Sequence, residues 1–398
     1  MKSSNPKLLC VWNEVPHLGG AERRMARIMN LVSSQDVEVD FLFLLEEISL
    51  DRIRDMYSQA LSGECMIRFS AVNNSREIFH YVRNSRADLA CYMGFVSPKR
   101  ILIPYLAADS VARIPTLMFL VSTGQSIHHF PTFLHRVAFD VAAVLADRID
   151  CLYPSATESV QRRFPMCRVT TTPCPGTLLD VFVPAEKKKV IAFVSRWVEV
   201  KNVRLFFDSV LAIEEDLYQA GYIVQLCGKS SDGQMEEYIA RRLASARHPE
   251  IIHCPGFIKP ETVLPEAELF LSLQDINNYP SQSLLEAISS GCYIIASDEG
   301  DTRRIVKPEF GTCCKLSVPS VAKSILEYLK ISQEDKMKAV EAARSFALEN
   351  FHIETSAAYY ADIAREAAAT KKQSLFRRLV NSRRQCQANT AQESDGSK

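Results

Sequence analysis

Short apolar runs alternate with helix-length amphipathic segments along most of the chain. In its first part, strands are predicted over residues 8–12, 37–45, 89–93, 116–121 and 149–153. A helix between the first two strands is indicated by apolar residues at spacings of three, four and seven, namely Met25, Ile28, Met29 and Val32. This alternation of buried strands with amphipathic helices is typical of an α/β protein with parallel sheets.

A second series of the same kind follows the charged run 186–189. Its strands are predicted over residues 190–194, 222–227, 269–273 and 293–296, with a further short strand before Gly256, and helices separate the main strands. Two such series predict two doubly wound, Rossmann-like domains, residues 1–185 and 186–350, facing each other across a cleft. Ligands of such folds bind outside the carboxyl ends of the strands, so we expect the functional site there.

The end of the chain has a different character. A last helix is predicted over residues 355–369, within a segment 351–369 that follows the second domain. Residues 370–398 lose apolar periodicity and end in Ser, Gln, Asn and Gly, so we expect a disordered basic and polar tail. Two interpretations of its basic residues stay open: a solvated tail, or a weak anchor to anionic lipid at a membrane surface. These residues are Lys371, Lys372, Arg377, Arg378, Arg383 and Arg384.

The amino-acid composition excludes several classes of protein. With 398 residues, 47% of them apolar and 24% charged, the chain has the make-up of a folded protein. Its 47 basic and 47 acidic residues cancel, which argues against nucleic acid as a partner. No secretory signal and no apolar run of roughly 20 residues is recognised, and the 12 cysteines lack paired metal-ligand spacing. We therefore expect a cytoplasmic protein, peripheral at the inner face of the membrane if the tail is an anchor.

The segment 273–298 holds the strongest chemical signal. Ser281 follows Pro280 and is placed to cap a helix that ends at Gly291. A helix start that follows a strand offers unpaired N–H groups and a positive dipole end, which suit a phosphate. Glu286 lies about one turn in, where its carboxylate could accept both hydrogen bonds of a ribose cis-diol. The residue types alone leave open that Glu286 is a surface glutamate.

This block resembles the donor-binding signature of the family-4 retaining glycosyltransferases, members of the glycosyl transferases group 1 with the GT-B fold. That signature is a Glu, seven residues, a second Glu, a small residue and a glycine-terminated helix. Glu286 to Gly291 matches its second half, while Asn278 stands where the family has the first Glu, which contacts the donor sugar. Asn carries no charge, so the identity of the donor stays open. The resemblance implies donor-binding roles for Glu286, Asn278, Tyr279, Pro280, Ser281, Leu284 and Leu285.

A second block, residues 190–202, leads from a predicted strand to Arg196 and Lys201. Two cations just past a strand end can clamp a diphosphate, Arg as a planar fork and Lys as a point charge. The family carries Arg and Lys at this spacing, bound to the donor diphosphate, so the resemblance implies catalytic roles for both. It also implies that no metal ion and no cofactor is needed, since such cations replace the divalent metal of other glycosyltransferases.

A third block, residues 15–22, places Gly19 and Gly20 between a predicted strand and a helix. It does not match the G-x-G-x-x-G dinucleotide fingerprint, but it resembles the family's GGAE loop, which approaches the donor phosphates and the acceptor. Gly228 closes a strand as in the family's glycine loop, which adds it to the donor-binding candidates. Many relatives have a His near the reacting sugar, and His128 and His129 both stay open as its counterpart.

The resemblance implies a metal-independent, retaining hexosyltransferase or related enzyme. Such an enzyme moves a sugar from a nucleoside diphosphate sugar to a hydroxyl of a glycan or lipid-linked acceptor, in polysaccharide or glycolipid assembly. It also implies a last helix that crosses back to the first domain. The alternatives are a sugar-nucleotide-binding protein that is inactive alone or needs a partner subunit, an NAD-linked oxidoreductase and a GT-B-like epimerase. The missing dinucleotide fingerprint disfavours the oxidoreductase, and the transferase spacing of Arg196, Lys201 and Glu286 disfavours the epimerase.

Overall fold

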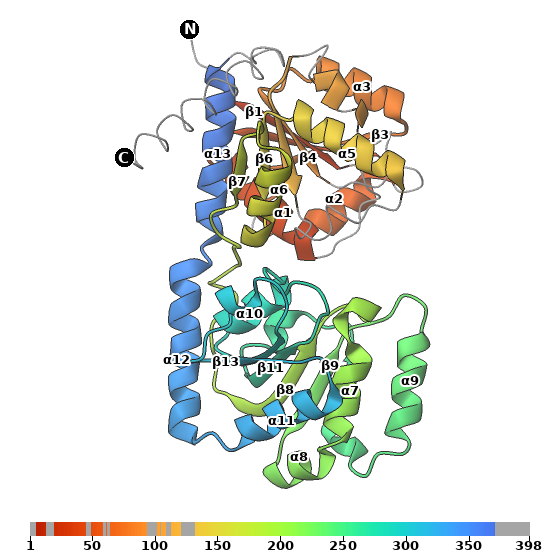
Figure 1. Ribbon diagram of the computed structural model, residues 1–398, viewed down its shortest axis with the longest axis vertical. Coiled ribbons are helices and arrows are strands. Elements are labelled where there is room, and N and C mark those ends of the chain that lie inside the picture. Colours follow the sequence, from red (N-terminus) through yellow and green to blue (C-terminus); the bar gives the residue numbers. More distant parts are fainter. Residues whose placement is uncertain are drawn as a thin grey trace, which may run out of the picture. The chain divides into compact units, whose positions relative to one another are not determined.

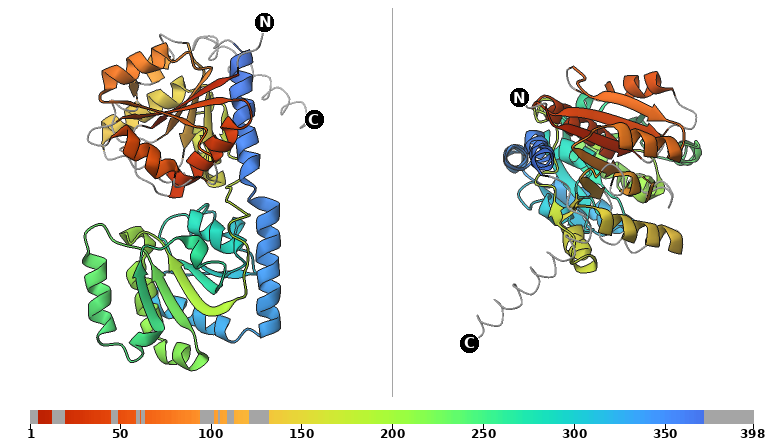
Figure 2. Two further views of the ribbon diagram at one scale, coloured as in Figure 1. Left: turned by 180° about the vertical axis from the view of Figure 1, so that it is seen from behind. Right: turned by 90° about the horizontal axis from the view of Figure 1, so that it is seen from above.

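The chain divides into two units in the computed structural model (Figures 1 and 2). Unit 1 comprises Met1–Pro173 and Glu354–Lys398, and unit 2 comprises Cys174–Ile353. The residues that the structure describes are 5–12, 20–44, 49–58, 61, 64–93, 102–103, 105–108, 113–120 and 132–370.

The segment 174–185, which the sequence analysis assigned to the first domain, lies in unit 2. Thr177 forms an isolated parallel bridge with His352, near the end of the unit. The guanidinium of Arg344 donates to the carbonyl oxygen of Phe182 at 3.0 Å. These contacts hold the start of unit 2 against its end.

The described part of unit 1 is built on a seven-stranded sheet in the order β3-β2-β1-β4-β5-β6-β7. Every pair of neighbouring strands is parallel. The central strands are apolar and buried along their whole length because helices cover both faces of the sheet. The strands are β1 (Lys7–Trp12), β2 (Glu38–Leu44), β3 (Arg68–Val72), β4 (Leu89–Met93), β5 (Thr116–Leu120), β6 (Arg148–Cys151) and β7 (Val169–Thr171).

The helices of unit 1 pack on the sheet through apolar stripes. In α1 the buried residues include the four that the spacing predicted, Met25, Ile28, Met29 and Val32. A core cluster on one face of the sheet joins residues of α3, α5 and α6. The helices described are α1 (Gly20–Ser33), α2 (Leu50–Ser58), α3 (Ser75–Asn84), α5 (Phe133–Leu145), α6 (Pro154–Arg163) and α13 (Ile353–Ala369).

The last helix, α13, is fastened to unit 1 through Asp150, a fully buried residue of β6. The hydroxyl groups of Tyr359 and Tyr360 donate to its two carboxylate oxygens at 2.7 and 2.8 Å. Those of Thr170 and Thr172 donate to the same oxygens, both at 2.8 Å. Burial raises the pKa of Asp150, while these four donors act in the opposite direction. The predicted return of the last helix to the first domain is thus confirmed.

The sheet of unit 2 has six strands in the order β10-β9-β8-β11-β12-β13, and its paired strands are all parallel. The strands are β8 (Lys188–Val194), β9 (Ile223–Cys227), β10 (Ile252–Gly256), β11 (Ala267–Ser272), β12 (Tyr293–Ser297) and β13 (Gly311–Cys314). The α-helices are α7 (Val203–Leu211), α8 (Glu214–Ala220), α9 (Gln234–Leu243), α10 (Gln282–Ser289), α11 (Val318–Leu329) and α12 (Gln333–Asn350). Short 3₁₀ helices occupy Glu199–Lys201, Pro249–Ile251, Pro260–Thr262 and Thr302–Arg304.

Among the described helices, none is long and apolar enough to cross a bilayer. Residues 371–398, which hold the six basic residues of the predicted tail, lie outside the described part of the chain.

Candidate functional site

The loops that follow β8 and β9 pack closely against each other at Gly228, which has φ +152°. A Cβ atom at this position would overlap the carbonyl oxygen of Ser195 and the indole nitrogen of Trp197. The N–H of Ser195 donates to the carbonyl of Cys227 at 3.1 Å. Only glycine allows this approach, so Gly228 positions the backbone next to Arg196.

Arg196 and Lys201 both lie just past the carboxyl end of β8. The side chain of Arg196 is exposed, whereas Lys201 is half-buried and its Nζ donates to Oε1 of Gln274. Asn202 follows in the left-handed conformation, with φ 53°, and its Nδ2 donates to the carbonyl of Leu273 at 2.8 Å. This bond fixes the Lys201 segment against the end of β11.

Burial lowers the pKa of Lys201 to about 8, and the charge of Arg196 acts in the same direction. The nearby Asp275 opposes both effects. Two cations that repel each other at the edge of a sheet favour an anion between or beside them, because an anion relieves the repulsion.

The side chain of Asn278 is fully buried and connects the end of β11 to the end of β12 by hydrogen bonds. Its Oδ1 accepts from the hydroxyl of Ser272 at 2.7 Å. Its Nδ2 donates to Oγ of Ser297 at 2.6 Å and to the carbonyl of Ser297 at 3.3 Å. A sugar contact through this side chain would require one of these bonds to be exchanged, and the role of Asn278 in donor binding stays a prediction.

Asn277 joins the loops that follow β11 and β12. Its Oδ1 accepts from the backbone N–H groups of Tyr279 and Asp301, at 2.9 and 3.0 Å. A Cβ atom on Gly300 would lie 2.5 Å from Cγ of Asn277. Tyr279 and Pro280 are buried in this tightly packed segment. The loop before α10 is therefore fixed by hydrogen bonds within itself and to the loop that follows β12.

Helix α10 begins after Ser281, which stands at the N-cap position. The predicted cap is wrong in its side-chain part, because Ser281 makes no capping hydrogen bond with its hydroxyl. The helix ends at Gly291 as expected, with φ +72°. The N–H of Gly291 bonds to Ile288 and that of Cys292 to Ala287, both at 3.0 Å, which is a Schellman motif. The first-turn N–H groups of α10 are thus not capped by the hydroxyl of Ser281.

Glu286, Leu284 and Leu285 on α10 are all fully buried. The interpretation of Glu286 as a surface glutamate is therefore excluded. Leu284 and Leu285 belong to the apolar core, so a donor contact from either of them would have to use the backbone. Neither this contact nor the ribose contact of Glu286 is tested by the geometry alone.

The structure brings most of the predicted site residues to one edge of the unit 2 sheet, at the carboxyl ends of β8, β9 and β11. We call this the carboxyl edge; it holds Arg196, Lys201, Gly228, Asn278, Tyr279, Pro280, Ser281, Leu284, Leu285 and Glu286. Gly20 begins α1 in unit 1. Gly19, His128 and His129 lie outside the described residues.

Three polar residues of this edge were missed from the sequence: Gln274, Ser272 and Ser297. Gln274 is buried; besides accepting from Lys201, its Nε2 donates to the carbonyl of Asn277 at 2.7 Å. The hydroxyl of Ser297 donates to the backbone carbonyl of Gln274 at 2.5 Å. The signal that could have found Gln274 is a large polar residue directly after an apolar strand.

Within the part of the chain that the structure describes, no three His, Cys, Asp or Glu side chains lie close enough to hold a metal ion. The prediction that the reaction needs no metal rests on the Arg196–Lys201 pair and stays a prediction.

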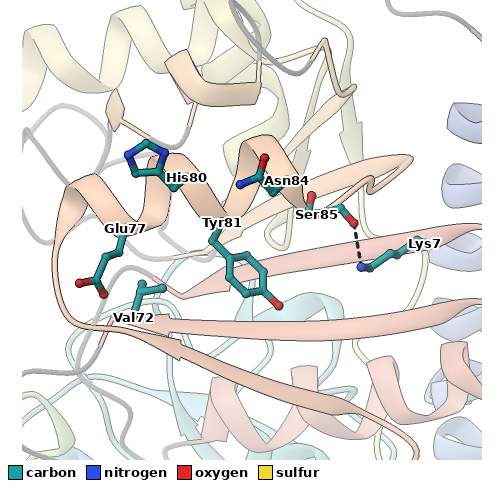
Figure 3. A pocket seen from close by; sticks show the side chains of 7 residues that line it. All are labelled: Lys7, Val72, Glu77, His80, Tyr81, Asn84 and Ser85. Atoms are coloured by element: carbon teal, nitrogen blue, oxygen red, sulfur yellow. Dashed lines mark hydrogen bonds between the residues drawn. The ribbon is translucent and has the colours of Figure 1, made fainter.

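Unit 1 carries a hollow of about 460 Å³ along α3, shown in Figure 3. Two of its polar groups are bonded within the protein. Nζ of Lys7 donates to the carbonyl of Ser85 at 2.8 Å, and the hydroxyl of Tyr81 donates to Asp40 at 2.5 Å. The lining residues are Lys7, Val72, Glu77, His80, Tyr81, Asn84 and Ser85, none of which the sequence predicted as functional.

Comparison with solved structures defines the class of fold. HepE from Anabaena, in complex with UDP and glucose, superposes with a TM-score of 0.70 at 13% identity, covering 89% of this chain and 98% of that one. A variant of TarM from S. aureus, in complex with UDP and other ligands, gives 0.72 at 10% identity, covering 90% and 99%. Sucrose-phosphate synthase from Thermosynechococcus elongatus gives 0.67 at 14% identity, covering 92% and 99%. The chain therefore has the GT-B fold, as predicted.

The family of the second unit is defined by sequence. Residues 179–346 match the model of the family "Glycosyl transferases group 1". No curated protein matches the chain. The resemblance to this family is thus confirmed: residues 179–346 are a glycosyl transferases group 1 domain, and they contain the whole carboxyl edge described above.

Proposed function

We propose that this protein is a retaining, metal-independent glycosyltransferase that uses a nucleoside diphosphate sugar. The observation that carries the proposal is the Arg196–Lys201 pair at the carboxyl edge of a glycosyl transferases group 1 domain. A sugar nucleotide leaves as a diphosphate, whose negative charge grows in the transition state. Preorganised cations stabilise that charge most effectively where water is limited.

Donor binding is assigned to the same edge. The buried carboxylate of Glu286 accepts hydrogen bonds from the ribose, and the N–H groups at the start of α10 face a phosphate. Gly228 keeps the backbone close to the nucleotide. Asn278, Tyr279, Pro280, Ser281, Leu284 and Leu285 complete the donor set assigned in unit 2, and the resemblance assigns Gly19 and Gly20 to donor binding as well.

The transfer step needs no nucleophile from the protein. The bond between the anomeric carbon and the phosphate oxygen breaks, and the acceptor oxygen attacks from the same face. The acceptor proton passes to the leaving phosphate, which departs as the nucleoside diphosphate. Arg196 and Lys201 hold that leaving group. The configuration at the anomeric carbon is retained because the acceptor attacks from the face that the leaving group departs from.

Solved relatives support a uridine nucleotide as the first donor to test. The structure of HepE contains UDP-glucose, and that of the pneumococcal O-GlcNAc transferase GtfA contains UDP and GlcNAc. We assign transfer of a hexose or related sugar to a hydroxyl of a glycan or lipid-linked acceptor, in polysaccharide or glycolipid assembly in the cytoplasm.

A second candidate function rests on Asn278. This side chain stands where the family carries a sugar-binding Glu, and its hydrogen bonds are made inside the protein. A site without that carboxylate fits a protein that binds sugar nucleotides but is inactive alone, or that needs a partner subunit. One relative is a complex of two chains, GtfA/B.

A panel of UDP-, GDP- and TDP-sugars separates these functions. The purified chain is incubated with each donor, with and without EDTA, while release of the nucleotide is followed and binding is measured by calorimetry. Release that persists in EDTA supports the transferase. Binding without release, in every donor and with every acceptor, supports the binding protein. Absence of both rejects the carboxyl edge as a nucleotide-sugar site.

A further inference from the structure

Helix α5 of unit 1 turns a row of large apolar side chains toward solvent, and Figures 1 and 2 show this helix on the outside of the unit. Four of these side chains recur at spacings of three, four and three residues, as in the seam along which two helices pack. A fifth, the most exposed, comes directly before them. This α5 row consists of Phe133 (77% exposed), Leu134 (67%), Val137 (40%), Val141 (41%) and Val144 (41%).

The α5 row is too small for a stable contact with a separate protein. The helix from Leu134 to Val144 is about 15 Å long, whereas a stable interface takes roughly 800 Å² and 20–30 residues from each partner. A segment of the same chain needs much less area, because a short linker holds it at an effective concentration in the millimolar range. The α5 row therefore favours an occupant that is already tethered to unit 1.

The end of α13 supplies such a tether. Glu366, in the last turn of α13, accepts hydrogen bonds from Arg148 at 2.8 Å and from Arg168 at 2.9 Å. Arg148 begins β6 three residues after the end of α5, so α13 and α5 end at the same edge of the sheet. The two helices cover opposite faces, and the chain has to pass this edge to reach the α5 row. Residues 370–374 span up to about 17 Å when extended, which brings the residues after them to the last turns of α5.

The sequence just beyond α13 carries a matching apolar pattern. Its four apolar side chains share one side of a helix, because they are one or four residues apart, while the two arginines between them fall on the other side. A helix over residues 374–382 is about 13 Å long, close to the length of the α5 row. A helix this short is marginal in water and needs an apolar partner. The apolar residues are Leu375, Phe376, Leu379 and Val380, and the arginines are Arg377 and Arg378.

The charge beside the α5 row also suits this segment. Asp140 supplies the carboxylate of α5, and at 100° per residue it lies next to Phe133. It accepts from Arg163 at 2.6 Å, yet its side chain remains 37% exposed. A carboxylate at this place disfavours an anionic surface and can accept a further hydrogen bond from Arg377 or Arg378.

We propose that residues 374–382 form a short helix that packs on the α5 row of the same chain. The four apolar side chains of this segment cover the row, and its two arginines stay on the outer side. The contact involves no residue of the carboxyl edge, so it is independent of the transferase proposal. It gives the start of the tail a role that is neither a solvated chain nor a lipid anchor.

The test is amide hydrogen exchange of the full chain, followed over residues 375–382. The α5 variant carries Leu134→Ser and Val137→Ser, both at exposed positions. Its matched control carries Met337→Ser and Leu348→Ser, at exposed apolar positions of α12 in unit 2. We expect these amides to exchange at least roughly tenfold faster in the α5 variant than in wild type and in the control. Thermal melting checks that the variants are folded.

A tail variant with Leu375→Ser and Leu379→Ser approaches the same contact from its other side, and both positions lie outside the described part of the chain. Protection of residues 375–382 should be lost to the same extent, and combining the tail and α5 substitutions should add nothing, because each removes the same contact. An apolar dye should bind the tail variant more strongly than wild type, and this gain should disappear when the α5 substitutions are also present.

Four outcomes would overturn the proposal. Exchange of residues 375–382 in wild type at the rate of an unstructured peptide would leave a solvated tail. Protection that develops only when phosphatidylglycerol vesicles are added would assign the tail to a lipid surface. Equal protection in wild type and in the α5 variant would mean that the segment packs elsewhere. Protection that is lost on dilution would mean that the tail of a second copy covers the α5 row.

Discussion

Each unit holds an ionisable side chain that is hydrogen-bonded inside the protein, Asp150 fully buried in unit 1 and Lys201 half-buried in unit 2. The surroundings of the two groups are opposite in kind. Asp150 in unit 1 receives four hydroxyl donors at 2.7–2.8 Å. Lys201 in unit 2 donates to the neutral amide of Gln274 and lies near the like charge of Arg196. A charge whose partners are all supplied by the protein serves the fold. A cation whose neighbours include another cation is suited to a ligand that completes its surroundings.

The largest effect is expected at Lys201. Lys201→Ala removes a donor to the leaving diphosphate, so turnover should fall by a factor of roughly 10² or more, in buffer containing EDTA. The melting temperature should stay near that of wild type, since the half-buried ammonium costs desolvation to bury. Steady-state kinetics and thermal melting measure both. A variant as active as wild type, together with a strict need for Mg²⁺ or Mn²⁺, would reject the assigned role.

A substitution of Asp150 should affect stability and leave nucleotide binding unchanged, the reverse of the effect expected at Lys201. Asp150→Ala leaves four hydroxyl groups without their acceptor, which should lower the free energy of unfolding by about 2–3 kcal/mol. Nucleotide affinity at the carboxyl edge should not change. Because the folded-state pKa of Asp150 is raised, its contribution to stability is present at low pH and is lost as the pH rises through that pKa. Denaturation at several pH values should show this component in wild type and not in the variant.

At Glu286 the expected effect is on binding. Glu286→Gln keeps the shape of the side chain but removes its charge, so affinity for donor and for free nucleoside diphosphate should fall alike. Loss of a charged hydrogen bond costs about 1.5–3 kcal/mol. Calorimetry with the diphosphate and with the full donor tests whether both decrease. Unchanged affinity for both would remove Glu286 from the site.

Gln274 gives a smaller and pH-dependent effect. The pKa of Lys201 is about 8, so the empty site loses this proton as the pH rises through that value. Bound diphosphate favours the protonated form, and its affinity should therefore fall above pH 8. Gln274→Leu removes the acceptor of the ammonium and should move this fall to lower pH, with affinity near pH 8 reduced roughly fivefold. Gln274→Glu should move it to higher pH. A pH profile unchanged in both variants would show that Gln274 does not position Lys201.

The smallest effect is expected at Asn278. If one of its internal hydrogen bonds is exchanged for a sugar hydroxyl, Asn278→Ala should change discrimination among sugars on one nucleotide by less than roughly fivefold. Affinity for the bare diphosphate should stay level. Asn278→Glu should raise hydrolysis or transfer if the natural residue weakens an ordinary site. No change with any donor would confine Asn278 to bracing β11 and β12.

The sequence by itself determined the central architecture of both units. Strands such as β4, β5, β8 and β11 are apolar runs buried on both faces, and such runs can be recognised without tertiary information. The strands β3, β7 and β13 were not predicted. They lie at the ends of the two sheets, where one side is partly solvated and the apolar run is short.

Tertiary structure decided which polar residues of the site act together. Arg196, Lys201 and Glu286 could be chosen from the sequence because each lies within a recognisable strand, loop or helix pattern of its own block. The bonds from Gln274 to Lys201 and from Asn278 to Ser297 join loops that follow different strands. Parallel strands bring such loops together at one edge regardless of their separation along the chain. Partners of this kind follow from the strand order, which no local pattern in the sequence contains.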